Sequence, residues 1–406
     1  MGIKFNVERF ADVRTPFYYY DTNILRQTLD AINTEIKKHD NYFVHYAVKA
    51  NANLKVLKVI NEAGFGIDCV SGGEIEQVLK AGFPANKIVF AGVGKSDWEI
   101  ELGLDKDIFC FNVESIPELE VINEIATRKG KVATVCFRIN PNVGAHTHAN
   151  ITTGLAENKF GIDMQDMEKV IRIAQEMKNV QFKGLHFHIG SQILEMDDFI
   201  ALANRINELQ DKLEAAGIHI EIVNVGGGLG VDYKNPQGNP IPNFKDYFAV
   251  YEKYLKLRPG QTVHFELGRA VVAQCGALIT KVNYVKENAI KKFVIVDAGF
   301  TDLIRPALYD AHHKIINLTT DNGQRITDNG QQTTDNRQRT TDNCQRYDVV
   351  GPICESSDVF DKDISLPETH RGDLLALLSA GAYGEIMASG YNCRRLPEGY
   401  TSEELQ

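Results

Sequence analysis

Short apolar runs alternate with amphipathic segments between residues 42 and 270. The apolar runs are rich in β-branched and aromatic residues, whereas the segments between them repeat apolar residues at helical spacing. Strands that alternate with helices form parallel sheets. Eight such repeats predict a (β/α)8 TIM-like barrel, although the pattern alone also permits an open, doubly wound sheet. The predicted strands are residues 42–50, 66–70, 87–93, 108–113, 132–140, 180–190, 219–228 and 262–270.

The pattern changes after residue 270, where strand-like runs follow one another without long helices between them. We therefore predict an α/β chain with two domains, a barrel followed by a mostly antiparallel β-sandwich or β-barrel domain. We expect the N-terminal segment to pack with the β domain. The predicted boundaries are residues 1–35 for the N-terminal segment, 36–272 for the barrel and 273–406 for the β domain.

Residues 319–346 form four tandem heptapeptides, TTDNGQR, ITDNGQQ, TTDNRQR and TTDNCQR. A coiled coil needs two apolar positions in each heptad, and only Ile326 and Cys344 are apolar here. Threonine, asparagine, aspartate and glycine favour turns and bury little surface. We interpret the segment as an exposed loop inserted in the β domain, with a binding arm as the alternative.

Composition narrows the possible functions. Hydrophobic residues make up 43% and charged residues 24% of the chain, and the net charge is −10. A negative chain is a poor binder of nucleic acid or of anionic membranes. No apolar run is long enough to span a membrane, and we expect no secretory signal because the first residues lack an apolar stretch. Its seven cysteines have no Cys-x-x-Cys spacing and are interpreted as reduced thiols in a cytoplasmic protein.

Several predicted strands end in polar or glycine-rich clusters. The ends of parallel barrel strands meet at one face, which is where barrel active sites form. Lys49 is notable because it ends an apolar strand: either its ammonium reaches solvent, or it is kept as an amine for covalent chemistry. The other clusters contain Asp68, Arg138, His188, Gly226 to Gly228, and Glu266 with Arg269.

The clusters suggest one cofactor. GGGLG at 226–230 fits a phosphate cradle, although glycine runs also form tight turns. His186 and His188 lie on one side of a strand, but no cluster of carboxylates or cysteines accompanies them, so we predict no metal site. Glu266 and Arg269 would both reach the barrel mouth. Pyridoxal phosphate needs a lysine, a carboxylate for its ring nitrogen and a phosphate cradle.

The sequence resembles the fold-type III pyridoxal-phosphate decarboxylases, and among them the branch that acts on meso-2,6-diaminopimelate. The resemblance covers nearly the whole chain except residues 319–346. Two departures occur where the family usually has proline and asparagine, at Leu267 and Gly390 respectively. The matching motifs are YAVKAN (46–51), HFHIGSQI (186–193), GGGLG (226–230), ELGR (266–269), CESSD (354–358) and GAYGEIMASGYN (381–392).

The resemblance implies that Lys49 forms the Schiff base with pyridoxal 5'-phosphate and that His188 stacks on its ring. Glu266 would pair with the ring nitrogen, and Asp68 and Arg138 would support the site. Cys354 would be the proton donor, supplied with Glu355 across the interface of a homodimer. The implied phosphate ligands are Ser191, Gly226, Gly227, Gly228, Gly268, Arg269 and Tyr383. The implied substrate contacts are Arg269, Arg305, Tyr309, Glu355 and Tyr383.

The implied reaction is decarboxylation of meso-2,6-diaminopimelate to L-lysine and CO2, the last step of lysine biosynthesis. Arg305 could hold the far carboxylate of this substrate and Glu355 its far amine. The alternatives are a related decarboxylase of ornithine, arginine or a carboxylated polyamine, and a non-catalytic homologue that binds the cofactor. The ornithine-type relatives carry aspartate in place of Glu355, and a non-catalytic homologue is expected to lack Lys49 or Cys354.

Overall fold

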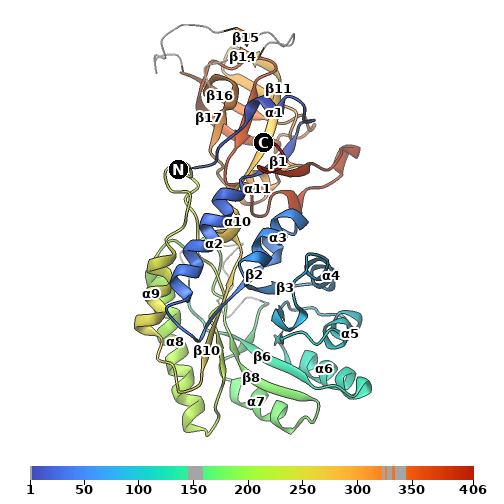
Figure 1. Ribbon diagram of the computed structural model, residues 1–406, viewed down its shortest axis with the longest axis vertical. Helices are drawn as coiled ribbons and strands as arrows, with labels where there is room; N and C mark the ends of the chain where they lie inside the picture. Colours follow the sequence, from blue (N-terminus) through green and yellow to red (C-terminus); the bar gives the residue numbers. More distant parts are fainter. Residues whose placement is uncertain (1, 145–158, 322–324, 327–331, 334–343) are drawn as a thin grey trace. The chain divides into compact units, whose positions relative to one another are not determined.

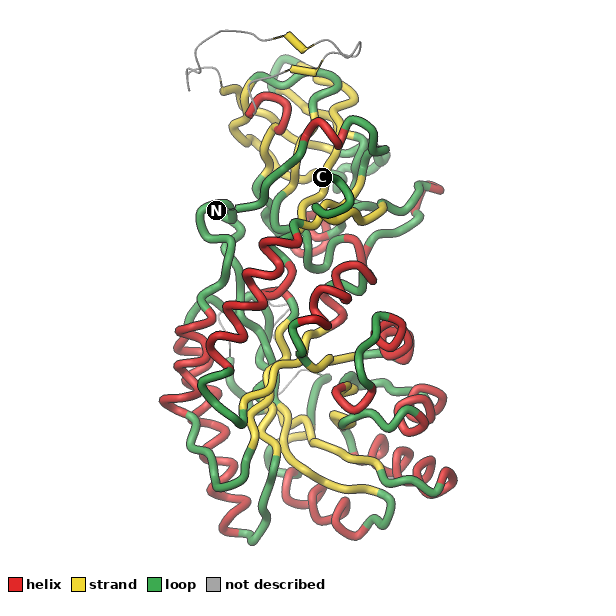
Figure 2. The backbone as a smooth tube through the Cα atoms, in the orientation of Figure 1, coloured by secondary structure: helices red, strands yellow, loops and turns green. Residues whose placement is uncertain are grey.

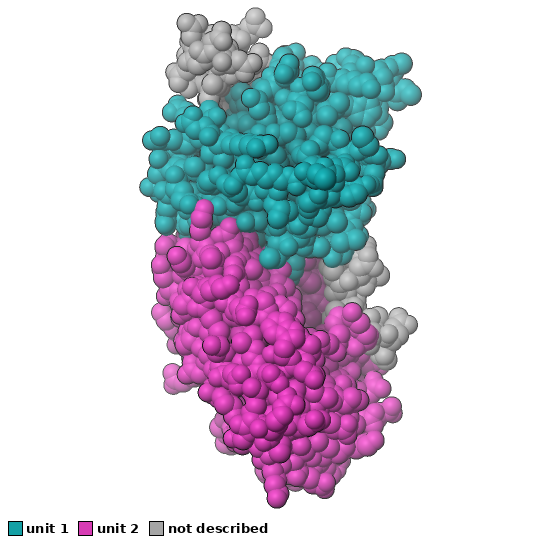
Figure 3. All heavy atoms as spheres, turned by 90° about the vertical axis from the view of Figure 1, so that its right-hand side faces the viewer, with its two compact units in different colours: residues 1–25, 232–240, 272–406 teal, residues 26–231, 241–271 magenta. Residues whose placement is uncertain are grey.

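The computed structural model describes residues 2–144, 159–321, 325–326, 332–333 and 344–406. The chain divides into two compact units, shown in separate colours in Figure 3. The barrel unit contains Arg26–Val231 and Ile241–Val271. The β unit contains Met1–Leu25, Asp232–Pro240 and Val272–Gln406.

Eight parallel strands of the barrel unit close on themselves, because the last strand pairs with the first and β5 pairs with β6. This closure confirms the predicted (β/α)8 barrel and excludes an open sheet. A short additional strand, β7 (Ile162–Asp163), pairs with β6. The barrel strands are β2 (Tyr42–Ala47), β3 (Gly66–Cys69), β4 (Ile88–Phe90), β5 (Cys110–Val113), β6 (Ala133–Asn140), β8 (Val180–His186), β9 (Ile222–Asn224) and β10 (Thr262–Leu267).

Figure 1 shows helices around the outside of these strands. Several begin within a few residues of a strand end because a side chain there caps the helix. Asn53, Ser71 and Ser115 accept hydrogen bonds from the backbone N–H groups of Lys55, Glu74 and Glu118. The helices are α2 (Thr22–Ile36), α3 (Leu54–Glu62), α4 (Gly72–Lys80), α5 (Asp97–Asp105), α6 (Ile116–Lys129), α7 (Met167–Glu176), α8 (Met196–Ala215), α9 (Phe244–Tyr254) and α10 (Arg269–Val272).

All eight barrel strands are shorter than predicted, and the early ends of β2 and β9 affect the barrel mouth. β2 ends at Ala47, and Val48–Ala50 forms a 3-10 turn, so Lys49 lies in the turn rather than at the end of the strand. β9 ends at Asn224 rather than at residue 228. Gly226 and Gly228 have φ angles of 70° and 107°, which no strand residue adopts.

The β unit is built around one mixed sheet that nearly closes into a barrel (Figure 2). β1 pairs antiparallel with β11 and parallel with β19, so the N-terminal segment belongs to this sheet. Buried side chains of β1, β11 and β18 form its core with Phe10 of α1. The strands are β1 (Phe17–Tyr20), β11 (Gly276–Glu287), β12 (Lys292–Val296), β13 (Ile315–Asn317), β16 (Cys344–Val350), β17 (Val359–Pro367), β18 (Leu374–Leu377) and β19 (Glu398–Thr401).

Smaller elements complete the β unit. These are α1 (Val7–Phe10), α11 (Arg305–Tyr309), α12 (Leu318–Asp321), and a pair formed by β14 (Arg325–Ile326) and β15 (Gln332–Thr333). Most of the predicted loop insertion at 319–346 lies outside the described residues. Among the described helices, none combines the length and apolar character needed to cross a membrane.

Candidate active site at the carboxyl ends of the barrel strands

The ends of the barrel strands bring polar side chains from distant parts of the sequence into contact. Asp68 is next to last in β3, and Glu266 is next to last in β10. His186 and Asn224 are the last residues of β8 and β9. Lys49 follows β2 in the 3-10 turn. Parallel strands place these positions at the same end of the barrel, as expected for an active site of this fold.

The centre of the cluster is the carboxylate of Glu266, which is 6% exposed. Its Oε2 lies 2.9 Å from His186 Nε2, and its Oε1 accepts hydrogen bonds from Asn224 Nδ2 at 2.7 Å and Asn112 Nδ2 at 3.0 Å. Burial alone raises the pKa of Glu266. The charge and hydrogen bond of His186, the charge of Lys49 and the bond from Asn224 outweigh burial, and the pKa lies well below its usual value. Glu266 is therefore ionised at neutral pH.

Lys49 Nζ donates a hydrogen bond of 3.3 Å to Asp68 Oδ2. The lysine side chain is 39% exposed, whereas Asp68 is completely buried. Burial, together with the charge of Glu266, raises the pKa of Asp68 to about 8 despite the opposing charge of Lys49. Asp68 Oδ1 has no hydrogen-bond partner within the described part of the chain. The pair therefore combines a reachable amine with a carboxyl group that holds a proton near neutral pH.

His188 lies two residues beyond β8 and is half-buried. Its Nδ1 accepts a hydrogen bond of 3.4 Å from the backbone N–H of Gly227. Burial and the charges of Arg138 and Lys49 lower the pKa of His188 well below its usual value. A neutral imidazole beside the glycine segment can pack on a flat ring without adding positive charge.

The glycine segment packs too closely for side chains. A Cβ at Gly227 would lie 1.9 Å from the carbonyl oxygen of Glu266, and one at Gly226 would lie 2.2 Å from the carbonyl oxygen of Phe187. Nearby, Arg269 donates to Ser191 Oγ from Nε at 3.2 Å and from Nη2 at 3.0 Å. The backbone N–H groups of glycines and a buried guanidinium are both groups that bind phosphate.

Arg138, predicted as a supporting residue, forms a buried ion pair of 3.0 Å with Glu114. Glu114 also accepts hydrogen bonds from the backbone N–H groups of Gly92 and Gly161. The guanidinium carbon lies 4.7 Å from the centre of the Phe160 ring. These contacts fix the ends of β4, β5 and β6 relative to one another.

Gly268 lies in the barrel unit, where a Cβ would come 3.1 Å from Ala47 Cβ. The other predicted site residues belong to the β unit. Arg305 begins α11 and is buried; its Nη1 lies 2.9 Å from His313 Nε2, and its guanidinium carbon lies 5.0 Å from the centre of the Tyr233 ring. Cys354 and Glu355 are exposed, and Glu355 accepts a hydrogen bond of 2.7 Å from Tyr391. The remaining two, Tyr309 and Tyr383, are half-buried.

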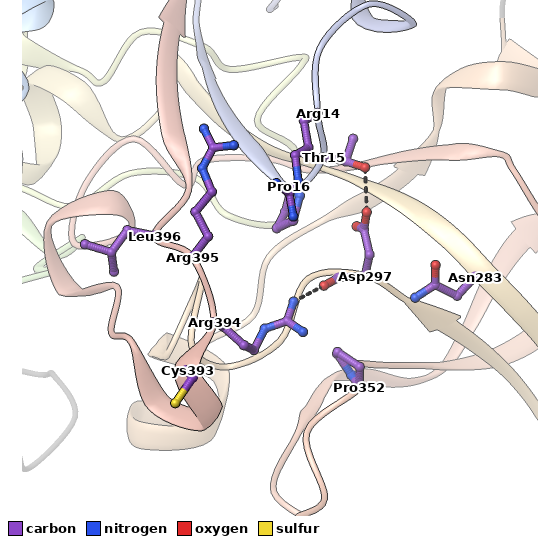
Figure 4. A pocket seen from close by; sticks show the side chains of 10 residues that line it. All are labelled: Arg14, Thr15, Pro16, Asn283, Asp297, Pro352, Cys393, Arg394, Arg395 and Leu396. Carbon is purple, nitrogen blue, oxygen red and sulfur yellow. Dashed lines mark hydrogen bonds between the residues drawn. The ribbon is translucent and has the colours of Figure 1, made fainter.

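The β unit also has a pocket of about 420 Å³ lined by Arg14, Arg394, Arg395 and Asp297 (Figure 4). Most of the charged side chains that line the pocket already have partners in the protein. Arg394 donates to the backbone carbonyl of Asp297, and Thr15 donates to the Asp297 carboxylate. Arg395 pairs with Glu398. We therefore place the chemistry at the barrel mouth rather than in this pocket.

Sequence reasoning missed the residues that hold Glu266. Asn112 and Asn224 lie in apolar strands, and a polar residue near a strand end has many possible roles. It also missed Lys95, which is buried and donates to the carbonyl oxygens of Gly92 and Asn112 and to Glu118. The only available signal was the break that Asn112 and Asn224 make in the apolar runs IFCFNV and IVNV.

The residues present fit pyridoxal phosphate. A buried, ionised carboxylate suits a protonated ring nitrogen, Lys49 supplies an amine, and the glycine segment with Arg269 suits a phosphate. Asp68 Oδ1 adds a buried polar atom without a hydrogen-bond partner among the described residues. Within the described ranges, no group of three or more metal-binding side chains occurs.

Comparison with known proteins gives consistent matches. The sequence model of the pyridoxal-dependent decarboxylase pyridoxal binding domain matches residues 23–273. The diaminopimelate decarboxylase of Bacteroides thetaiotaomicron is 67% identical over 401 residues, covering 99% of each chain. The crystal structure of the Helicobacter pylori diaminopimelate decarboxylase complexed with L-lysine has a TM-score of 0.86 at 40% identity, covering 97% of this chain and 93% of that one. The corresponding structure from M. jannaschii, also with L-lysine, has a TM-score of 0.86 at 36% identity, covering 98% and 90%.

Proposed function

Because the chain belongs to the pyridoxal-dependent decarboxylases, and within them to the diaminopimelate decarboxylase family, we propose that it converts meso-2,6-diaminopimelate to L-lysine and CO2. The cofactor is pyridoxal 5'-phosphate, and the reaction is the last step of lysine biosynthesis. One observation supports this reaction most directly. A buried Glu266, hydrogen-bonded to His186, Asn112 and Asn224, shares the barrel mouth with the amine of Lys49.

We assign the cofactor contacts as follows. Pyridoxal phosphate, when bound, supplies a sink for the electron pair left on the substrate's α-carbon as CO2 departs. Lys49 supplies the amine that attaches it, and Glu266 keeps its ring nitrogen protonated. His188 would pack on the ring face. The residues that would hold the phosphate are Ser191, Gly226 to Gly228, Gly268, Arg269 and Tyr383.

Proton transfers are assigned to two groups. Asp68, whose pKa burial raises to about 8, holds a proton beside Lys49 Nζ near neutral pH. Cys354 Sγ gives a proton to the α-carbon after CO2 has left, and solvent then returns a proton to the sulfur. The exposure of Cys354 supports this role because a thiol that contacts substrate has to be accessible.

Substrate choice is assigned to the β unit. A substrate with an amino acid at each end presents a far carboxylate, which suits the planar guanidinium of Arg305. Its far amine suits Glu355, and Tyr309 and Tyr383 complete the contacts together with Arg269. His313 and the Tyr233 ring fix the orientation of the Arg305 guanidinium in advance of binding. Ornithine, arginine and polyamine-like substrates lack this far carboxylate.

We further propose a cytoplasmic homodimer in which each subunit supplies Cys354 and Glu355 to the active site of the other. Support comes from the exposure of both residues and from Tyr391, which is 50% exposed, binds Glu355 and stacks on Phe300. Exposed aromatic side chains are enriched at protein interfaces. All seven cysteines are free thiols.

Genetic complementation tests the proposed function. The gene should restore growth without lysine to a bacterial strain that lacks its own diaminopimelate decarboxylase. The Lys49→Ala variant, expressed to the same level, should fail to do so. Growth failure with the soluble wild-type protein would contradict the proposal.

A further inference from the structure

The carboxylate of Glu266 has an uneven set of partners. A carboxylate accepts about four hydrogen bonds, two at each oxygen. Oε1 receives both Asn112 Nδ2 at 3.0 Å and Asn224 Nδ2 at 2.7 Å, whereas Oε2 receives only His186 Nε2 at 2.9 Å. Within the part of the chain that the structure describes, one acceptor position therefore remains, and it belongs to Oε2.

The orientation of the Asn224 amide is fixed by a second bond. Its Oδ1 accepts a hydrogen bond of 2.9 Å from the backbone N–H of Gly226. Because an oxygen must face this N–H group, the NH2 group must face Glu266. The same side chain therefore connects the carboxylate to the first glycine of the predicted phosphate segment.

Asn112 is held through its backbone. Lys95 Nζ donates a hydrogen bond of 2.7 Å to the carbonyl oxygen of Asn112 and another of 2.6 Å to Glu118 Oε1. The Lys95 side chain is only 1% exposed, so it holds the end of β5 from inside the protein. Asn112 itself is 1% exposed and has little room to turn away from Glu266.

We infer that Asn112 and Asn224 are positioning residues that fill Oε1 of Glu266 and so direct the ring N–H of the cofactor to Oε2. The inference rests on the proposed function because it takes pyridoxal phosphate as the cofactor. Loss of either amide leaves the buried Oε1 with one donor instead of two, and the carboxylate can then rotate or take up a proton. Asn224 has an additional effect, since its loss also frees the N–H group of Gly226.

The two asparagines are tested by Asn112→Leu and Asn224→Leu, which keep similar volume and remove the donors. Asn207→Leu is the matched control: Asn207 is also buried in the barrel unit and makes two hydrogen bonds, to the Tyr254 carbonyl and from the Lys256 N–H. The measurements, on purified holoenzyme, are the dissociation constant of pyridoxal phosphate and the pH dependence of its visible absorption. Melting temperatures report how much each substitution lowers the stability of the folded protein.

Both site variants should bind the cofactor about ten- to a hundredfold more weakly, as expected for loss of a hydrogen bond to a charged group. Their absorption should change with pH at a different midpoint from the wild type. Asn207→Leu should lose stability but keep the wild-type affinity and midpoint. If Asn112→Leu does not fold, Asn112→Ser, which shortens the donor, is expected to show the same two shifts.

Wild-type affinity and an unchanged midpoint in either folded Asn112 variant would overturn the inference. So would equal shifts in Asn207→Leu, because a general loss of packing would then explain them. A different result would contradict the proposed function. A wild-type protein that binds pyridoxal phosphate but does not release CO2 from diaminopimelate would refute the substrate assignment and leave this test unaffected.

Discussion

Replacement of Glu266 by glutamine removes the buried negative charge and keeps the size of the side chain. The structure makes this substitution severe because three donors converge on the carboxylate. A glutamine can offer its oxygen to the two asparagines only by pointing its own NH2 group at His186. We expect the protein to fold and to bind the cofactor weakly.

The magnitude follows from the lost charge. A pair of unit charges about 4 Å apart interacts by about 4 kcal/mol at an effective dielectric constant of about 20. If Glu266 stabilises the protonated ring nitrogen by this amount as the reaction proceeds, Glu266→Gln should lower kcat by about a thousandfold. A further loss in cofactor affinity would come from the disturbed hydrogen bonds.

The assay is CO2 release at saturating pyridoxal phosphate, with bound cofactor quantified by absorbance. Asp198→Asn is the control because it makes the same acid-to-amide change at a buried carboxylate in α8. It should retain most of the activity. A Glu266→Gln protein with full cofactor and more than about a tenth of wild-type kcat would refute the role given to this charge.

Four further predictions follow from the same structure. Borohydride reduction and peptide mass mapping should place the pyridoxyl group on Lys49, and an adduct on another lysine would refute that assignment. Folded Asp68, with a pKa of about 8 against an ordinary 3.8, retains a proton that the unfolded chain releases. The stability of cofactor-free protein should therefore fall as pH rises between these values, and urea titrations of Asp68→Asn should show a flatter pH dependence; an equal slope would contradict the shift. Arg305→Lys should lower kcat/KM for diaminopimelate about ten- to a hundredfold but leave trace turnover of ornithine unchanged, and an unchanged ratio would remove Arg305 from specificity. In mixtures of Lys49→Ala and Cys354→Ala subunits, about one active site in four should be intact if the dimer shares its sites, and no recovery after proven exchange would refute sharing.

The sequence predicted the barrel because its eight apolar runs have the spacing of a parallel sheet with helices. The pairing of β10 with β2 then excluded the open sheet that the pattern also permitted. It also indicated that Lys49, Asp68, His188 and Glu266 lie at one end, since parallel strands share a direction. The same regularity does not determine where a strand stops. The 3-10 turn that contains Lys49 and the short β9 depend on local backbone angles near Ala47 and Gly226.

The partners of Glu266 were not predictable for a different reason. Asn112 and Asn224 lie 154 and 42 residues from Glu266 in the sequence, and their contacts depend on how the closed barrel sets the register of its strands. The burial of Lys95 likewise depends on Glu118 and on two carbonyl groups brought together by folding. A charged residue in a polar stretch gives no sign of such burial.

Release of CO2 from individual substrates tests the central claim most directly. The purified protein, loaded with pyridoxal phosphate, is incubated separately with each stereoisomer of diaminopimelate, with ornithine and with arginine. We predict that the meso isomer gives CO2 and L-lysine in equal amounts, with a kcat/KM far above those for ornithine and arginine. Preferred turnover of ornithine or arginine, or no turnover of any substrate by protein with full cofactor, would contradict the account.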